Sequence, residues 1–287
     1  MTVVPILSLS GAPGVTTMAC LLASTWPATG PVAVIECDSS GGDLAARFGL
    51  SATLGWPSLS AAVRRTGTST SLDPHLQLLP GGLPVLVGAR AGSPVPADSS
   101  EARLVRAAFG SRASDGLAVI DLGRFPGVMD VAGSWLTTAD YTIVMVRDDA
   151  AAALRVRERA EELVRRTEGR VGVVVVGGTG FDSRELAEFT GLAPLGDLPF
   201  DPVSAGVASG ASGAGRRLER SRLLASTRRV AEFVDDRTGD VAMHDAASDG
   251  VVVPTSTHEP VRPSGRSPGS SLQTDDRRPG TLVGGAA

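Results

Sequence analysis

Residues 10–17 read Ser10-Gly11-Ala12-Pro13-Gly14-Val15-Thr16-Thr17, and they join an apolar run at residues 3–7 to a helical pattern at residues 16–25. A strand, a tight loop of small residues and a helix N-terminus together form the arrangement in which backbone N–H groups and the helix dipole hold phosphate. The stretch therefore predicts an α/β fold with an anion site. A purely structural alternative is that Thr16 and Thr17 only cap the helix.

Outward from this stretch, apolar β-branched runs keep alternating with helical patterns. We expect strands at residues 3–7, 32–35, 76–79, 85–87, 117–122, 142–146, 171–176 and 195–198, and helices at residues 16–25, 43–48, 100–109, 150–166, 183–190 and 216–234. Runs such as residues 171–176 are apolar on both faces of the pleat, as in strands covered by helices on either side. The pattern predicts a doubly wound, mainly parallel sheet with helices on both faces.

The alternation continues without a linker to residue 236, so residues 1–236 are expected to form one domain. In residues 237–287, 23 of 51 residues are Gly, Pro, Ser or Thr and none is aromatic. Such a segment has little apolar surface to offset its ordering entropy. We predict a disordered low-complexity tail.

Charge and composition exclude several classes of protein. A net charge of −4 argues against a general nucleic-acid coat protein, which needs a basic surface. The sequence contains no run of about 18 apolar residues and no export signal, so we expect a cytoplasmic protein. Cys20 and Cys37 belong to no CxxC pair and are interpreted as reduced thiols rather than zinc ligands.

The loop lacks the cation that such phosphate sites normally carry. A standard P-loop places lysine immediately before the Ser/Thr, where it reaches the terminal phosphates. Val15 stands there, and all 27 basic residues of the chain are arginine. The arginines Arg47, Arg124 and Arg147 are candidates to supply the missing charge, although none lies on the loop.

The loop resembles that of the MinD/ParA branch of P-loop ATPases, which reads Lys-Gly-Gly-x-Gly-Lys-Thr-Thr. Four positions agree with it: Gly11, Gly14, Thr16 and Thr17. Three depart from it: Ser10 at the signature lysine, Ala12 at the second glycine and Val15 at the phosphate lysine. The resemblance implies a degenerate member without loop lysines, in which ATP phosphates contact Gly11, Ala12, Pro13, Gly14, Val15, Thr16 and Thr17, and Thr16 binds Mg²⁺.

Three further segments are similar to motifs of that family. Glu36-Cys37-Asp38 resembles its Asp-x-Asp switch, with Asp38 at the catalytic position that orients water. Val119-Ile120-Asp121-Leu122 resembles its Walker B strand, whose aspartate assists Mg²⁺. Gly196 to Asp201 resembles a stretch near the nucleotide base, but the base-reading asparagine is absent because the chain contains none. A structural role as strand-end acids stays open for Asp38 and Asp121.

The resemblance implies a role in intracellular positioning, such as chromosome partitioning, septum placement or localisation of a secretion or pilus machine, with a protein partner and a possible homodimer. The alternative is a pseudo-ATPase scaffold that binds partners without ATP turnover. Val15 argues against efficient hydrolysis, because phosphoryl transfer depends on positioned positive charge. Weak ATPase activity is compatible with the sequence.

Six arginines lie between Arg216 and Arg229, in a predicted helix with an apolar side. Its arginines form either a solvated face or a nonspecific DNA contact, as in partition ATPases. The family's amphipathic membrane-binding tip has no counterpart in residues 280–287, so membrane contact is not expected.

Overall fold

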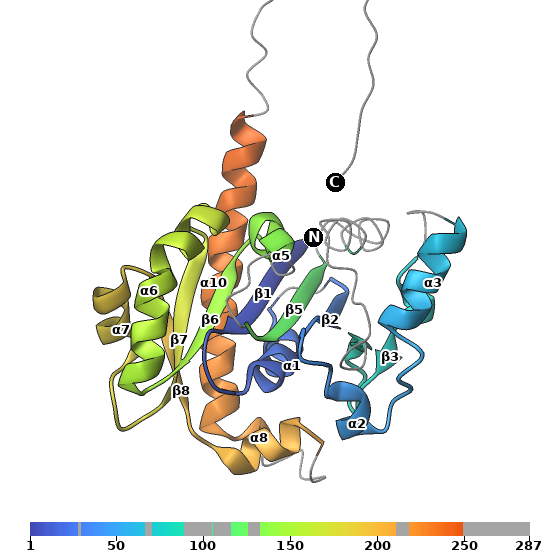
Figure 1. Ribbon diagram of the computed structural model, residues 1–287, viewed down its shortest axis with the longest axis horizontal. Helices are drawn as coiled ribbons and strands as arrows, with labels where there is room; N and C mark the ends of the chain where they lie inside the picture. Colours follow the sequence, from blue (N-terminus) through green and yellow to red (C-terminus); the bar gives the residue numbers. More distant parts are fainter. Residues whose placement is uncertain are drawn as a thin grey trace, which may run out of the picture. The chain divides into compact units, whose positions relative to one another are not determined.

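A computed structural model describes residues 1–27, 30–66, 71–88, 105, 116–125, 133–210 and 218–248, with side chains except at residues 66, 133 and 240–248. Within these residues, eight strands form one sheet (Figure 1). The strands are β1 (Thr2–Ser8), β2 (Val32–Glu36), β3 (Gln77–Leu78), β4 (Pro84–Leu86), β5 (Leu117–Arg124), β6 (Thr142–Arg147), β7 (Val171–Gly177) and β8 (Ala193–Pro199).

The strand order is β3-β4-β2-β5-β1-β6-β7-β8, and every neighbouring pair is parallel except β3 with β4. The predicted doubly wound, mainly parallel sheet is confirmed. Because the strands from β2 to β8 in this order run the same way, their carboxyl ends lie at one edge of the sheet. Ligands bind at this edge in open α/β sheets.

Helices cover both faces of the sheet (Figure 1). They are α1 (Val15–Thr25), α2 (Leu44–Phe48), α3 (Trp56–Thr66), the 3₁₀ turn η1 (Asp73–His75), α5 (Gly133–Thr138), α6 (Ala150–Thr167), α7 (Ser183–Thr190), α8 (Pro202–Ala208) and α10 (Arg222–Ser248). Alternation along β1 separates two apolar clusters, with Val3 and Leu7 in one and Val4 and Ile6 in the other. The first cluster includes α3, α5, α6 and α7, and the second includes α1 and α10.

Three helices were not predicted from the sequence: α3, α5 and α8. Each contains residues of low helix propensity, such as Ser60 in α3, Gly133 in α5 and Gly206 in α8. Tertiary packing overrides that propensity at α3 and α5, where Trp56 and Trp135 are among the largest fully buried side chains. The helix predicted at residues 100–109 lies outside the described residues, except for Val105.

The last helix differs from its prediction at both ends. It was expected at residues 216–234, whereas α10 begins at Arg222 and continues to Ser248, past the predicted domain boundary at residue 236. Residues 237–248 contain one Gly and no Pro, whereas residues 249–287 contain six Gly and five Pro, and averaging over both stretches obscured the difference. Residues 249–287 lie outside the described part of the chain.

Candidate functional site

The loop from β1 to α1 leaves the first turn of α1 without a side-chain cap. Gly14 occupies the N-cap position with φ +94° and ψ 38°, a left-handed conformation that favours glycine. The Ser8 hydroxyl donates to the Ser10 carbonyl at 2.7 Å, which fixes the entry to the loop. Because no side chain caps the helix, N–H groups of its first turn remain available to an anion.

Thr16, in the first turn of α1, faces Asp121 of β5. Asp121 is fully buried, and its Oδ1 accepts the Gly123 N–H at 3.0 Å. Its Oδ2 has no well-formed hydrogen bond within the described residues. Burial raises the pKa of Asp121 to about 7, helped by the charges of Glu36 and Asp38 and opposed by the Thr16 hydroxyl and the Gly123 N–H. The two predicted metal ligands therefore lie together.

These groups fit a magnesium ion that is held together with phosphate oxygens. Mg²⁺ takes oxygen ligands and is usually bound through one or two carboxylates plus substrate phosphates. Thr16 offers a hydroxyl, and Asp121 offers a buried carboxylate oxygen without a partner of its own. Among the residues that the structure describes, no group of three His, Cys, Asp or Glu side chains is arranged to hold a metal ion by itself.

Glu36, at the end of β2, has a clear structural role. Its Oε1 accepts the N–H groups of Asp43 at 2.7 Å and Leu44 at 2.9 Å, and its Oε2 accepts that of Gly88 at 2.7 Å. Burial raises the pKa of Glu36, and these backbone donors oppose the rise. The carboxylate thus ties the segment before α2 to the end of β4.

Asp38 lies beside the residues that follow Asp121 in β5. Its Oδ1 accepts the Ser40 N–H at 2.7 Å, and its carboxylate occupies the space that a side chain at Gly123 would need. Burial raises the pKa of Asp38, while hydrogen bonds from Ser40 and the Arg124 backbone lower it. The structure places Asp38 near Asp121; its role in orienting water stays a prediction.

Val15 and Thr17 are both held by protein contacts. Val15 is 5% exposed and belongs to the apolar cluster with Val4 and Ile6, so the position of the missing lysine is packed into the core. The Thr17 hydroxyl lies 3.1 Å from the Ser209 hydroxyl, which joins α1 to the end of α8.

A cavity of about 310 Å³ adjoins the loop, within the 300–1,000 Å³ typical of ligand sites. It is lined by Ala12, Pro13, Gly14, Thr17, Met18, Leu21, Met145, Val176, Leu198, Pro199, Phe200, Asp201, Pro202, Ala205 and Leu223. The predicted loop residues and the end of the segment from Gly196 to Asp201 therefore meet. Sequence reasoning missed Met18, Met145 and Leu223, since they belong to three separate elements and form no motif.

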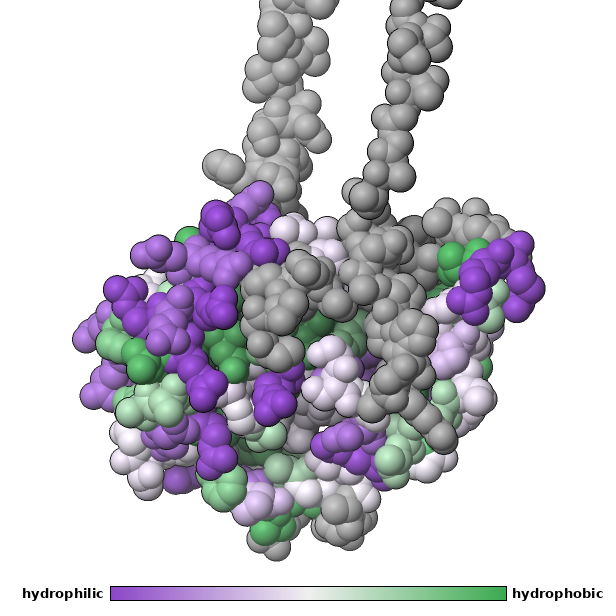
Figure 2. Space-filling view, in the orientation of Figure 1, coloured by the Kyte–Doolittle hydropathy of each residue, from purple (hydrophilic) through white to green (hydrophobic). Residues whose placement is uncertain are grey.

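Exposed apolar side chains continue from this cavity onto the surface. Phe200 is 73% exposed and Val203, in α8, is 47% exposed. Figure 2 shows hydrophobic side chains over α8 at the lower edge of the molecule, whereas the surface over α6 is largely hydrophilic.

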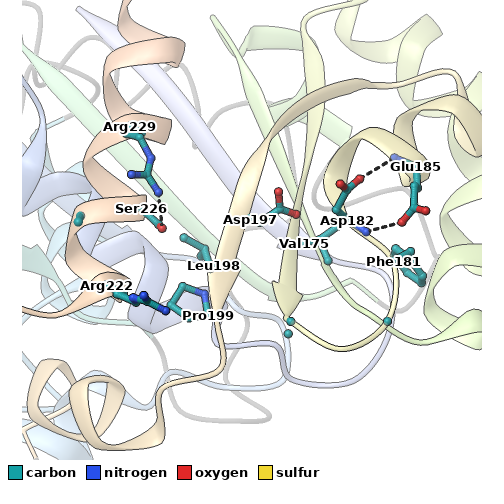
Figure 3. Close-up of a pocket in the computed structure, with 14 residues that line it drawn as sticks. Val175, Phe181, Asp182, Glu185, Asp197, Leu198, Pro199, Arg222, Ser226 and Arg229 are labelled. Atoms are coloured by element: carbon teal, nitrogen blue, oxygen red, sulfur yellow. Dashed lines mark hydrogen bonds between the residues drawn. The ribbon is translucent and has the colours of Figure 1, made fainter.

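A second cavity, of about 580 Å³, lies along the edge strand β8 (Figure 3). Arg222 and Arg229 of α10 lie on one side of β8, and Asp182 and Glu185 at the start of α7 lie on the other. Both acids belong to the capping box of α7. None of the predicted site residues lines this cavity, and its acids serve the local fold.

α10 presents its two sides as the pattern predicted. Leu223, Val230 and Val234 are buried, whereas Arg222 and Arg228 are exposed. Arg216 and Arg217 lie outside the described residues. No helix in the described ranges has the length and hydropathy needed to cross a bilayer.

Three solved structures with the same fold as this chain are distant from it in sequence. A MinC:MinD cell division complex from Aquifex aeolicus aligns with a TM-score of 0.64 at 14% identity, over 90% of this chain and 99% of the other. A ParA family ATPase from Chlorobium tepidum aligns with a TM-score of 0.62 at 14% identity, over 80% and 97%. The septum site-determining protein MinD of Pyrococcus horikoshii, complexed with Mg-ADP, aligns with a TM-score of 0.60 at 13% identity, over 83% and 98%.

No protein-family model matches the sequence. Comparison with curated proteins gave no match either. At these identities the similarity establishes the fold: the chain has the architecture of MinD and ParA proteins.

Proposed function

We propose that this chain is a nucleotide-binding protein that holds MgATP at residues 11–17. The observation that carries the proposal is the buried Asp121 Oδ2, which has no well-formed hydrogen bond within the described residues and lies beside Thr16 in a helix start that no side chain caps. In this proposal Gly11 to Thr17 contact phosphates, and Thr16 and Asp121 hold Mg²⁺. When bound, the ion would offset phosphate charge.

The proposed role is intracellular positioning, such as chromosome partitioning, septum placement or localisation of a secretion or pilus machine. It is supported by the shared fold with cell division MinD and a ParA family ATPase. A protein partner and a homodimer belong to this proposal, and so does DNA contact through the arginines between Arg216 and Arg229. If ATP is hydrolysed, Asp38 is the residue proposed to orient water, and the rate would be low without a loop lysine.

A second candidate function is that of a scaffold that binds partners without ATP turnover. It is favoured by Val15, whose burial in the core leaves no lysine ammonium at the phosphates. In that case phosphate release from MgATP would equal that of an Asp121→Ala variant, and partner capture would be indifferent to ATP and to Thr16→Ala.

Equilibrium binding of labelled ATP with and without magnesium tests the nucleotide function. We expect binding that magnesium strengthens, and we expect Thr16→Ala to weaken the magnesium-dependent binding about tenfold through loss of one polar ligand. Thr25→Ala is the matched control, because Thr25 lies in the last turn of α1 and bonds only to carbonyls of its own helix. Failure of the unaltered protein to bind ATP would reject the proposal.

The apolar wall of the smaller cavity predicts weak discrimination between bases. Val176-Gly177-Gly178 ends the strand that corresponds to the one with the base-reading asparagine in the resembling family, and Val176 lines the cavity. Both Asp201 carboxylate oxygens already accept bonds from Ser204. A pocket without polar readout distinguishes similar ligands poorly. We expect ATP and GTP affinities within about tenfold of each other, measured by competition, and a larger ratio in favour of ATP in Val176→Asn. A preference for ATP above about a hundredfold in the unaltered protein would contradict this.

A further inference from the structure

The pairing of β1 with β6 brings an arginine to the phosphate loop. Leu7 pairs with Val144 in the parallel register. Ser10, at the start of the loop, follows Leu7 by three residues. Arg147, the last residue of β6, follows Val144 by three residues. The side chain of Arg147 therefore emerges level with the position at which the resembling family carries its signature lysine.

The stem of Arg147 lies against the loop itself. A Cβ built on Gly11 would be 3.7 Å from Arg147 Cδ, an ordinary van der Waals contact. Gly11 has φ +66°, a left-handed conformation that a larger residue rarely adopts. The arginine stem thus passes within van der Waals reach of the Gly11 position, and the backbone conformation rather than a lack of space favours glycine there.

The guanidinium of Arg147 is exposed, and no ion pair holds it among the described side chains. The two acids that follow it are committed to backbone donors. Asp148 Oδ2 accepts the N–H groups of residues 178–180 at 2.9–3.0 Å, and Asp149 Oδ1 accepts that of Ala152 at 2.8 Å. The arginine charge is thus available to a ligand.

The other two candidate arginines are less suited. Arg47 forms an ion pair with Asp43 at 2.8 Å and donates to Ser209 at 3.4 Å, so its guanidinium is already engaged. Arg124 is exposed at the end of β5. Of the three, Arg147 is the one whose side chain lies within 4 Å of the position that a Cβ would take at Gly11.

We propose that the Arg147 guanidinium binds the phosphate chain of the nucleotide on residues 11–17, in place of the absent loop lysines. The inference rests on the proposed nucleotide function. The buried Asp121 Oδ2 beside Thr16 is an independent sign of a ligand at the same helix start. Arginine suits this role because its planar fork can bond two phosphate oxygens at once.

Binding of labelled MgATP and of adenosine to four proteins tests the inference: the unaltered protein, Arg147→Ala, Arg147→Lys and Arg157→Ala. Arg157 is an exposed arginine of α6 and is the control for loss of one positive charge. We expect Arg147→Ala to weaken MgATP binding roughly ten- to a hundredfold, with adenosine binding unchanged. Arg147→Lys should restore part of the loss, and Arg157→Ala should match the unaltered protein.

The failures of the two proposals are distinguishable. If the unaltered protein binds MgATP and Arg147→Ala binds it as well as Arg157→Ala does, the role of Arg147 is rejected and the nucleotide function stands. If the unaltered protein binds no MgATP, the nucleotide function is rejected and this inference with it. Equal thermal melting of the variants checks that the exposed substitutions leave the fold intact.

Discussion

Replacing Asp121 with asparagine is expected to raise the melting temperature of the nucleotide-free protein at pH 8 and to abolish the effect of magnesium on ATP binding. The buried carboxylate has one hydrogen bond from Gly123 and an Oδ2 without a well-formed partner. Its ionised form is therefore poorly stabilised in the folded protein. Asparagine keeps the shape and removes the charge that burial disfavours.

The pH dependence follows from the direction of the shift. The pKa of Asp121 is about 7 in the folded protein against 3.8 in an exposed reference. A raised pKa favours the protonated folded form, so the stability contributed by this group falls as pH rises from about 4 to about 7. At pH 8 the raised pKa lowers the free energy of unfolding of the unaltered protein by up to about 4 kcal/mol. Because Asp121→Asn removes this cost, we expect its melting temperature to be higher by on the order of 5–10 °C.

Thermal melts of both proteins between pH 5 and pH 8 measure this effect, with Asp236→Asn as a control at an exposed aspartate of α10. The gap between Asp121→Asn and the unaltered protein should widen as pH rises. A variant less stable than the unaltered protein at pH 8 would show that the carboxylate is satisfied without a cation. We thus expect Asp121→Asn to be more stable than the unaltered protein and to lose the effect of magnesium on ATP binding. Such opposition between stability and binding is typical of functional sites.

The fold and the loop between β1 and α1 could be predicted because their signals are local. A β-branched run, a small-residue loop and a helix pattern are contiguous at residues 3–25, and the same alternation recurs along the chain. Thr16 and Asp121 were predicted from two separate motifs, and parallel pairing of β1 with β5 brings those motifs together. The structure places the two side chains together, and their role as metal ligands stays a prediction.

The sequence named Arg147 as one of three candidate arginines but could not single it out, and it gave no indication of the hydrogen bonds of Glu36, because both depend on distant pairings. Arg147 reaches Gly11 only through the register of β1 with β6. Glu36 takes its third donor from Gly88, 52 residues away. The motif resemblance placed Glu36 in a switch segment. In the structure its carboxylate accepts hydrogen bonds from backbone N–H groups and so holds two segments of the chain together.

Glu36 and Asp121 are register partners on the neighbouring strands β2 and β5, yet we expect opposite effects when each is replaced. Glu36 is buried with three backbone donors on its carboxylate. In Glu36→Ala those N–H groups lose their acceptor, and a buried donor left unpaired costs about 1–3 kcal/mol. Water that enters the vacated space can accept hydrogen bonds from some of these N–H groups and so lowers the total cost. We therefore expect Glu36→Ala to lose about 3 kcal/mol in the free energy of unfolding.

Urea unfolding measures this loss, with Glu232→Ala as the control at an exposed glutamate of α10. Gly42 makes the test specific to the carboxylate. A Cβ at Gly42 would collide with the Glu36 carboxylate, so Gly42→Ala alone should cost about 1–3 kcal/mol. In the Glu36→Ala background the collision is gone, and the same change should cost less than about 0.5 kcal/mol. Additive losses would mean that Gly42 is required for a reason other than the carboxylate. The non-additive result would assign the buried Glu36 to the fold and leave Asp121, whose Oδ2 has no well-formed hydrogen bond within the described residues, as the carboxylate proposed for a ligand.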